Sequence, residues 1–215
     1  MKLRDFSKED FQMIEAAVTQ AESKISGEIV PVIVDQSGSY SLSVFRGSTL
    51  SAIMSFFLLY VFDRYGSPLD FFSPLIYLLT LLLSGTLTAL LIFMVPSLKR
   101  MLAGKDQLKK TCHQKAESLF LSNEVFNTRK RTGILIFISL LERIVIVKAD
   151  KGINEVVSQE KWDNLVANLI QDIRGGEKTK GIVKAIEECG KTILLNGFEK
   201  DANDINELEN KVRTA

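Results

Sequence analysis

A few carboxylates and arginines near the ends of predicted strands are the residues of this chain best suited to binding chemistry. Glu28 and Asp150 are candidate ligands for a hard cation such as Ca²⁺ or Mg²⁺, which prefers several carboxylate or carbonyl oxygens. Arg129 and Arg131 are candidates for holding a phosphate or a carboxylate through paired hydrogen bonds, with the Thr132 hydroxyl assisting. Catalysis would also require a nucleophile or a metal-bound water in fixed geometry, and the sequence shows neither.

The same residues have structural roles open to them. Glu28 could form an ion pair with an arginine that closes an edge of a sheet, and Asp150 could cap a turn at Gly152. Because two carboxylates make a sparse cation site, we favour structural pairing over catalysis for this set.

Composition argues against several other functions. The chain has one histidine, His113, on the expected solvent side of a helix, which argues against a histidine-rich metal site or a Ser-His-Asp triad. Cys112 and Cys189 fall on apolar faces of predicted helices, which indicates buried thiols. A formal net charge of +1 gives no indication of a nucleic-acid partner. The one cofactor that remains a candidate is a Ca²⁺ or Mg²⁺ ion.

The N-terminal residues predict a helix with a defined start. In the segment 6–11, Ser7 is placed as an N-cap, Asp10 completes a capping box, and the two flanking phenylalanines can form a hydrophobic staple. An apolar stripe at helical spacing continues to Ile25, and Gly27 is expected to end the helix.

Three segments predict strands. Residues 28–34 are β-branched, and Pro31 among them favours a sheet edge or a bulge. Residues 134–140 are apolar at every position, as expected of a central strand with helices on both faces. Residues 143–149 follow after a short turn, so these last two strands should form an antiparallel hairpin.

Three further segments carry apolar residues at helical spacing, and the chain ends in a polar tail. The predicted helices lie within residues 108–120, 159–173 and 182–194. From Glu199 onward the sequence is polar and acidic, and we expect it to be poorly ordered or to lie on the surface.

Two long uncharged apolar runs, residues 47–62 and 71–98, interrupt these elements. A membrane-spanning helix needs about 20 apolar residues, and a soluble core helix normally keeps a polar stripe that these runs lack. We therefore predict two membrane spans, Val44 to Phe62 and Leu75 to Val95, over the alternatives of a buried helical pair in a soluble protein or an interfacial re-entrant pair. The Ser, Thr and Gly residues inside the runs suit close packing within the hairpin or contact with a membrane partner.

Basic residues beside the spans predict their orientation. Lysines and arginines crowd the exit of the second span and Arg46 lies at the entry of the first, whereas the connecting segment has Arg64 alone. The rule that such residues stay inside places both chain ends in the cytoplasm and the hairpin tip outside, in a multi-pass protein of the cytoplasmic (inner) membrane.

The expected architecture is an α/β fold, with a small mixed β-sheet sandwiched by helices and interrupted by a two-helix transmembrane hairpin. Residues 1–43 and 99–198 would form a discontinuous cytoplasmic domain, residues 44–98 the hairpin, and residues 199–215 an acidic polar tail.

Chain direction brings the candidate binding residues together. If the first strand runs toward the membrane, the strand at 134–140 runs parallel to it and the strand at 143–149 runs away. The edge of the sheet far from the membrane then collects three segments: Ser26 to Glu28, Thr128 to Gly133, and Asp150 to Ile153. This edge is the predicted ligand-binding site.

Several short motifs occur in an order and spacing that resemble the TPM domain family, in its subset with an inserted transmembrane hairpin. They are SGEIV at 26–30, TRKRTGILIFISL at 128–140, IVKADKGI at 146–153, the helix that begins near Trp162, and the Asn-Glu-Leu of the tail. The resemblance implies a single α/β domain. It also implies either an acid phosphatase with a bound divalent cation or a scaffold in the assembly and repair of membrane complexes.

Two functional hypotheses follow. The first is a membrane-anchored binding or scaffold module whose partners are the lipid bilayer and membrane proteins. The alternative is a divalent-cation-dependent acid phosphatase that uses the same edge. Members of the family often carry an acidic residue where this chain has Lys130, and secreted members carry a Gly-aromatic-Gly turn where it has Asp150-Lys151-Gly152; both departures weigh against the enzyme.

Overall fold

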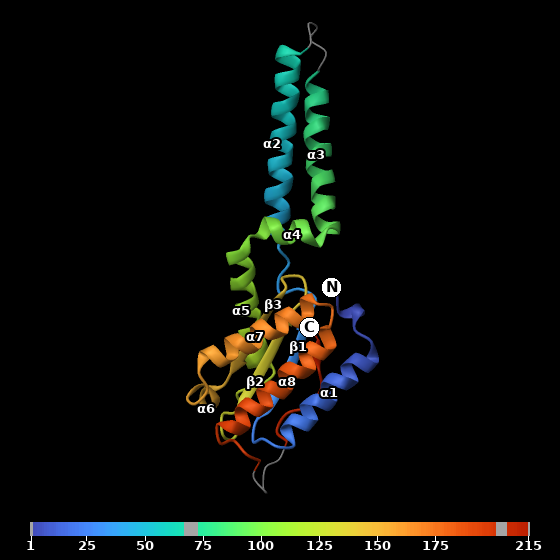
Figure 1. The fold of residues 1–215 in the computed structure, drawn as a ribbon. Coiled ribbons are helices and arrows are strands. Elements are labelled where there is room, and N and C mark those ends of the chain that lie inside the picture. Colours follow the sequence, from blue (N-terminus) through green and yellow to red (C-terminus); the bar gives the residue numbers. More distant parts are fainter. Residues whose placement is uncertain (1, 67–72, 201–205, 215) are drawn as a thin grey trace. The chain divides into compact units, whose positions relative to one another are not determined.

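The computed structural model describes residues 2–66, 73–200 and 206–214. The chain divides into two compact units, one built from residues up to 38 together with those from 109 onward, and one from residues 39–108. The elements, labelled in Figure 1, are η1 (Leu3–Asp5), α1 (Lys8–Glu22), β1 (Glu28–Val34), α2 (Ser41–Tyr65), α3 (Pro74–Met94), α4 (Pro96–Ala103), α5 (Lys105–Ser122), β2 (Gly133–Ser139), β3 (Ile144–Ala149), α6 (Lys151–Asn154), α7 (Gln159–Arg174), α8 (Lys178–Leu195) and β4 (Arg213–Thr214).

Within the described residues, the first unit contains one mixed sheet of four strands in the order β3-β2-β1-β4. β1 and β2 pair in parallel without interruption, from Glu28 opposite Gly133 to Val34 opposite Ser139. β3 runs antiparallel to β2. These pairings confirm the predicted α/β fold with a mixed sheet, a parallel first pair and an antiparallel hairpin.

The two central strands are buried on both faces because their side chains alternate between two hydrophobic layers. One layer contains Ile29, Ile33, Ile134, Ile136 and Ile138, packed with residues of α1, α7 and α8. The other contains Val30, Val32, Val34, Leu135 and Phe137, packed with Cys112, Ala116 and Phe120 of α5. Helices therefore cover both faces of the sheet, as the uninterrupted apolar run of β2 predicts.

The start of α1 is as predicted. The Asp10 amide donates to Ser7 Oγ at 3.1 Å, the Ser7 amide donates to Asp10 Oδ2 at 2.8 Å, and the rings of Phe6 and Phe11 lie 5.8 Å apart. This satisfies two amides that the first helical turn would leave unpaired. The helix ends at Glu22, three residues before the end of its apolar stripe.

Of the two positions expected for Pro31, the bulge is wrong, because the register between β1 and β2 runs through Pro31 without interruption. The edge position agrees with the structure at this residue, since on the side of β1 away from β2 no described strand pairs with Pro31. β4 pairs with Val32 and Ile33 only, so the ladder begins one residue after the proline. The missing amide hydrogen therefore interrupts no strand pairing.

The C-terminal tail does more than lie on the surface as expected. Its last described residues form β4, parallel to β1, and Glu199 makes an antiparallel bridge with Ile25. The side chain of Lys200 donates to the Glu22 carbonyl at 3.0 Å. Polar residues of the tail thus extend the sheet through backbone pairing, which needs no apolar side chains.

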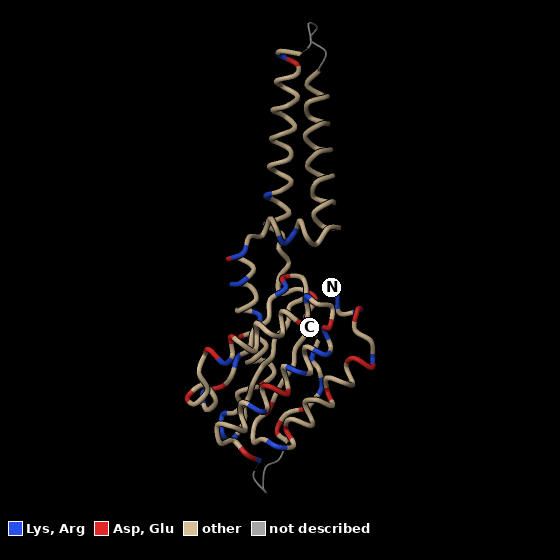
Figure 2. The backbone as a smooth tube through the Cα atoms, viewed as in Figure 1, with Lys and Arg blue, Asp and Glu red and all other residues tan. Residues whose placement is uncertain are grey.

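The second unit is a helical hairpin followed by a short helix. α2 and α3 lie side by side (Figure 1), and the Ser55 hydroxyl donates to Ser84 Oγ at 2.6 Å while Thr88 donates to Ser51 at 2.8 Å. This confirms that the small polar residues of the two runs pack against each other. Each helix is long and apolar enough to cross a membrane, and Figure 2 shows the charged residues of this unit near its ends.

Candidate functional site

The three segments predicted to converge at the start of β1 are brought together by backbone hydrogen bonds. The amides of Glu28, Asp150 and Gly152 donate to the carbonyls of Thr132, Gly133 and Arg131, at 3.3, 2.8 and 3.0 Å. The topology explains the convergence, because β1 and β2 both begin at this edge and β3 ends there. We call residues 26–28, 128–133 and 150–153 together the sheet-start edge.

Two glycines permit the close approach of these segments. A Cβ atom at Gly133 would lie 1.8 Å from the carbonyl oxygen of Val125, and one at Gly152 would lie 2.5 Å from that of Lys130. Both distances fall well inside van der Waals contact, and both atoms belong to backbone that cannot move aside. Any larger residue at these positions would push the segments apart.

Asp150 and Arg131 form a two-pronged ion pair within the sheet-start edge. Arg131 Nε lies 2.6 Å from Asp150 Oδ2, and Arg131 Nη2 donates to Asp150 Oδ1 at 3.0 Å. The same carboxylate is the N-cap of α6 and accepts the Lys151 amide at 2.8 Å. Asp150 is thus an N-cap as predicted, but its bond goes to the Lys151 amide, whereas the Gly152 amide donates to the Arg131 carbonyl. Asp150 is buried and the Arg131 side chain is half-exposed, so the guanidinium group of this pair remains in contact with solvent.

The C-terminal tail binds two further charged residues of this edge, Glu28 and Arg129. The Glu207 amide donates to Glu28 Oε1 at 3.0 Å, and the Glu207 carboxylate accepts the Arg129 amide at 3.1 Å. Arg129 Nε lies 3.5 Å from the same carboxylate. The Ser26 amide donates to the Phe198 carbonyl, and the Thr132 amide to the Thr128 hydroxyl. The candidate ligand residues thus bind one another and the tail.

A cation at this edge remains a prediction that rests on Glu28 and Asp150. Among the described residues, no group of three or more His, Cys, Asp or Glu side chains is arranged to hold a metal ion. Both predicted ligands already accept hydrogen bonds from protein amides, and Asp150 also pairs with Arg131. These contacts favour the structural role of the two carboxylates.

Sequence reasoning missed Glu22, a buried carboxyl group next to this edge. Its Oε1 accepts the Ile29 amide at 2.7 Å, and its Oε2 is buried. Burial, together with the nearby negative charge of Glu28, raises the pKa of Glu22 to about 8, although the hydrogen bond from the Ile29 amide opposes this rise. A signal was present in the sequence, because Glu22 follows Val18 by four residues and so lies on the apolar stripe of α1.

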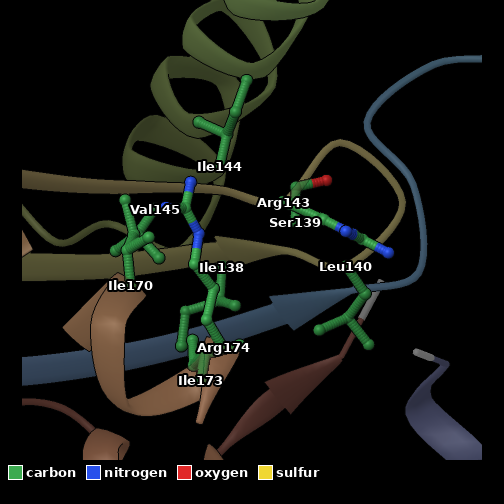
Figure 3. Close-up of a pocket in the computed structure, with 9 residues that line it drawn as sticks. All are labelled: Ile138, Ser139, Leu140, Arg143, Ile144, Val145, Ile170, Ile173 and Arg174. Carbon is green, nitrogen blue, oxygen red and sulfur yellow. The ribbon is translucent and has the colours of Figure 1, made fainter. Parts of the chain in front are cut away.

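The opposite end of β2 holds a pocket that the sequence did not predict. Its volume is about 260 Å³, and its walls come from the end of β2, the turn into β3, the start of β3 and the last turns of α7 (Figure 3). The lining residues are Ile138, Ser139, Leu140, Arg143, Ile144, Val145, Ile170, Ile173 and Arg174. We call it the strand-end pocket.

Two arginines supply the charge of the strand-end pocket. Arg174 comes from α7 and Arg143 from the turn before β3, and their guanidinium groups lie apart from each other (Figure 3). Both side chains are exposed, and in the described part of the chain no carboxylate forms an ion pair with either. An apolar cavity with two cations at its rim suits a ligand with an apolar body and negative groups.

A buried polar network lies behind this pocket and fixes its walls. Glu142 accepts the Ser37 amide at 2.8 Å and the Ser139 hydroxyl, while Ser37 Oγ lies 2.8 Å from Ser139 Oγ and 3.2 Å from Cys112 Sγ. Burial raises the pKa of Cys112 to about 11, so this thiol is no nucleophile at neutral pH. The network joins the segment after β1 to the β2–β3 turn.

Cys189, the second predicted buried thiol, is fully buried within the core, and burial raises its pKa as well. His113 is exposed on α5, as expected. Neither residue belongs to the sheet-start edge or to the strand-end pocket.

Comparison with known proteins supports the fold and gives a family. A family model described as the TPM domain matches residues 78–192, more than half of the chain. The structure is similar to the NMR structure of the BA42 protein from the psychrophilic bacterium Bizionia argentinensis, with 19% sequence identity, a TM-score of 0.59, and coverage of 98% of this chain and 95% of that chain. At this identity the likeness shows the fold alone. No curated protein matches the chain.

Proposed function

The chain belongs to the TPM domain family, and we propose that it is a membrane-anchored member whose α/β unit acts as a binding module for a membrane-associated complex. The observation that carries the proposal is the outward apolar surface of α2 and α3. Only 6% of the most apolar 18-residue stretch of each helix is buried, and the side chains of Leu83 and Leu87 are 66% and 69% exposed. Soluble proteins do not leave whole apolar helices in water.

Helix length agrees with insertion into a bilayer. α3 has 21 residues without a charge, so at about 1.5 Å per residue it is roughly 30 Å long, close to the thickness of a bilayer's hydrocarbon core. The proposed spans are Val44 to Phe62, which lies within α2, and Leu75 to Val95. α3 covers the second span up to Met94, one residue before its end.

The anchoring proposal is tested by placing lysines on α3. The double variant Leu83→Lys/Leu87→Lys should fail to insert, because each lysine near the middle of a span costs about 3 kcal/mol. The matched control is Leu121→Lys/Leu195→Lys, which changes two exposed leucines of the α/β unit. Wild type and control should stay in the pellet after alkaline carbonate extraction of membranes. If both double variants stayed in the pellet like wild type, membrane insertion would not depend on α3.

Orientation is proposed from the basic residues that flank the hairpin, with both chain ends in the cytoplasm. Tyr65 and Leu195 are highly exposed, and both natural cysteines are buried, so single cysteines at these positions give clean labels. A membrane-impermeant maleimide should label Tyr65→Cys in intact cells and Leu195→Cys only after permeabilisation. The reverse pattern would invert the proposed topology.

The strand-end pocket is the proposed binding surface of the α/β unit. It has apolar walls and two exposed arginines, whereas the charged groups of the sheet-start edge bind one another. The wild-type chain is purified from membranes in mild detergent, and the proteins that co-purify with it are identified. The Arg174→Glu variant should lose these co-purifying proteins. Lys191→Glu, an equal charge reversal on α8, should retain them. Equal recovery with both variants would refute a role for the pocket.

The alternative function, a divalent-cation-dependent acid phosphatase, is favoured by the gathering of Glu28, Asp150 and Arg131 at one edge. On this hypothesis the full chain hydrolyses an aryl phosphate when Mg²⁺ or Ca²⁺ is added. Glu28→Gln and Asp150→Asn keep the shape of each side chain and remove its charge, so both should abolish the activity. Activity that survives both substitutions would exclude these residues as metal ligands.

A further inference from the structure

A short basic helix crosses the end of the hairpin unit. α3 ends at Met94, Val95 is extended, and Pro96 opens α4 in a new direction (Figure 1). Proline has no amide hydrogen to continue α3 and disfavours a helical conformation in the residue before it. The break therefore follows from the sequence, although the apolar run from 71 to 98 gives no sign of it by composition.

α4 is held against the hairpin by close packing. A Cβ atom at Gly47 would lie 2.4 Å from Ile92 Cδ1 and 3.0 Å from Leu102 Cδ1, so α3 and α4 both meet α2 at this glycine. Ile92 and Ala103 are buried here, in a unit whose other apolar residues are mostly exposed. The position of α4 on α2 is thus fixed beside Gly47.

This packing gathers positive charge at one level of the hairpin. Arg46 directly precedes Gly47, and Lys99 and Arg100 lie within α4, close in sequence to Leu102. Lys99 and Arg100 lie within one helical turn of Leu102, the α4 residue that meets Gly47 beside Arg46. In the described part of this unit, Asp106 is the acidic residue at the same end, so positive charge dominates.

The level of Arg46 corresponds to a membrane surface. The 16 residues from 47 to 62 are uncharged, and at about 1.5 Å each they span roughly 24 Å up to Asp63. Arg46 and Asp63 can therefore reach opposite headgroup layers when their side chains extend outward. α4, which leaves the direction of α3 at the same level, then lies along the surface rather than across the bilayer.

We propose that Arg46, Lys99 and Arg100 form a binding site for the phosphate groups of anionic phospholipids, with α4 in the headgroup layer. This inference rests on the proposed membrane anchoring of the hairpin. Guanidinium groups hold phosphate oxygens through paired hydrogen bonds, and a lysine adds a third charge. Exposed Phe93, Met94 and Met101 flank these cations and would contact acyl chains, which a free phosphate does not offer.

The test compares lipid binding by two double variants of the full chain. Native mass spectrometry in detergent would measure dissociation constants for phosphatidylglycerol and phosphatidylcholine. Arg46→Gln/Arg100→Gln should weaken phosphatidylglycerol binding about 25-fold, or roughly fivefold per charge. Lys109→Gln/Lys110→Gln removes the same charge from exposed positions on α5, outside the site, and should leave the constant within about twofold. Phosphatidylcholine carries the same phosphate but no net charge, so its binding should weaken far less than that of phosphatidylglycerol in the first variant and stay unchanged in the second.

The possible outcomes separate the lipid site from the anchor. Equal losses in both double variants would reveal a diffuse basic surface, and no loss in either would show that these arginines hold no lipid; each result overturns the site. In both cases flotation of the wild-type chain with phosphatidylcholine vesicles would leave the anchoring proposal intact. A chain that stays soluble without detergent and floats with no vesicle would overturn both. Unchanged Trp162 fluorescence shows that the α/β unit of each variant folds, and an unchanged far-ultraviolet circular dichroism spectrum shows that the hairpin keeps its helices.

Discussion

Glu22 should make the stability of the α/β unit depend on pH in a way that one substitution removes. The group is buried, its Oε1 accepts the Ile29 amide, and burial with the charge of Glu28 raises its pKa from 4.5 to about 8. In the unfolded chain the carboxyl group returns to its ordinary pKa. The folded state therefore holds this proton more tightly than the unfolded state does.

The sign and size of the effect follow from the two pKa values. Because the folded pKa lies above the unfolded one, the stability from Glu22 is fully present below pH 4.5 and is lost as pH rises through 8. A shift from 4.5 to about 8 corresponds to about 5 kcal/mol over the whole range, of which roughly 3.5 kcal/mol is lost between pH 5 and pH 8.

Glu22→Gln is the perturbation that isolates this term. Glutamine keeps an acceptor for the Ile29 amide and carries no charge, so it resembles the protonated acid. The variant should exceed wild type by about 1 kcal/mol near pH 5, where the unfolded carboxyl group is already mostly ionised, and by roughly 4.5 kcal/mol near pH 8, a rise of about 3.5 kcal/mol. Other titrating groups act equally in both proteins and cancel from the difference.

The assay uses the single tryptophan of the chain, Trp162, which is buried in α7 and reports on the α/β unit alone. Urea unfolding of the detergent-solubilised chain, followed by Trp162 fluorescence, gives the free energy of unfolding at each pH. Glu187→Gln changes an exposed carboxylate on α8 and serves as the control. A difference between Glu22→Gln and wild type that stays constant from pH 5 to pH 8 would refute the assigned pKa shift.

Three more predictions concern the packing of the same unit. Gly133→Ala should lower the free energy of unfolding, measured by Trp162 fluorescence, by about 3 kcal/mol, because the new Cβ would meet the Val125 carbonyl at 1.8 Å. Asp150→Ala should cost about 2 kcal/mol in the same measurement and Arg131→Ala about 1, since the aspartate both caps α6 and forms the half-exposed ion pair; equal costs would deny the cap. Both cysteine thiols should resist an aromatic disulfide reagent at neutral pH until urea is added, and rapid reaction of the native chain would contradict their burial.

Short sequence patterns predicted most of the α/β unit, because its capping motifs and the spacing of its apolar residues reflect hydrogen bonds and burial within single helices and strands. The capping box at Ser7 places the start of α1, and the apolar residues of β2 require helices on both faces of the sheet. The sheet-start edge could be predicted in the same way. Once two parallel strands and a hairpin are assigned, the ends that meet follow from chain direction.

The features that escaped prediction depend on contacts between distant segments. β4 has two residues of a polar tail, and it forms only because β1 leaves an unpaired edge beside Val32. The strand-end pocket needs the last turns of α7 to meet the β2–β3 turn, and neither segment has a motif that indicates a cavity. Glu22 differs, because its place on the apolar stripe of α1 was visible in the sequence.

The two ends of the sheet show why charged residues that converge need not form a reactive site. At the sheet-start edge, Arg131 neutralises Asp150 and the tail binds Glu28, so a ligand would have to break these contacts before it could bind. At the other end, the buried carboxylate of Glu142 binds Ser37 and Ser139 behind the wall, while Arg143 and Arg174 remain exposed at the rim. Water already solvates these two arginines, so a negative ligand displaces water alone. Binding energy is therefore available at the strand-end pocket, where crevices at the carboxyl ends of parallel strands commonly receive ligands.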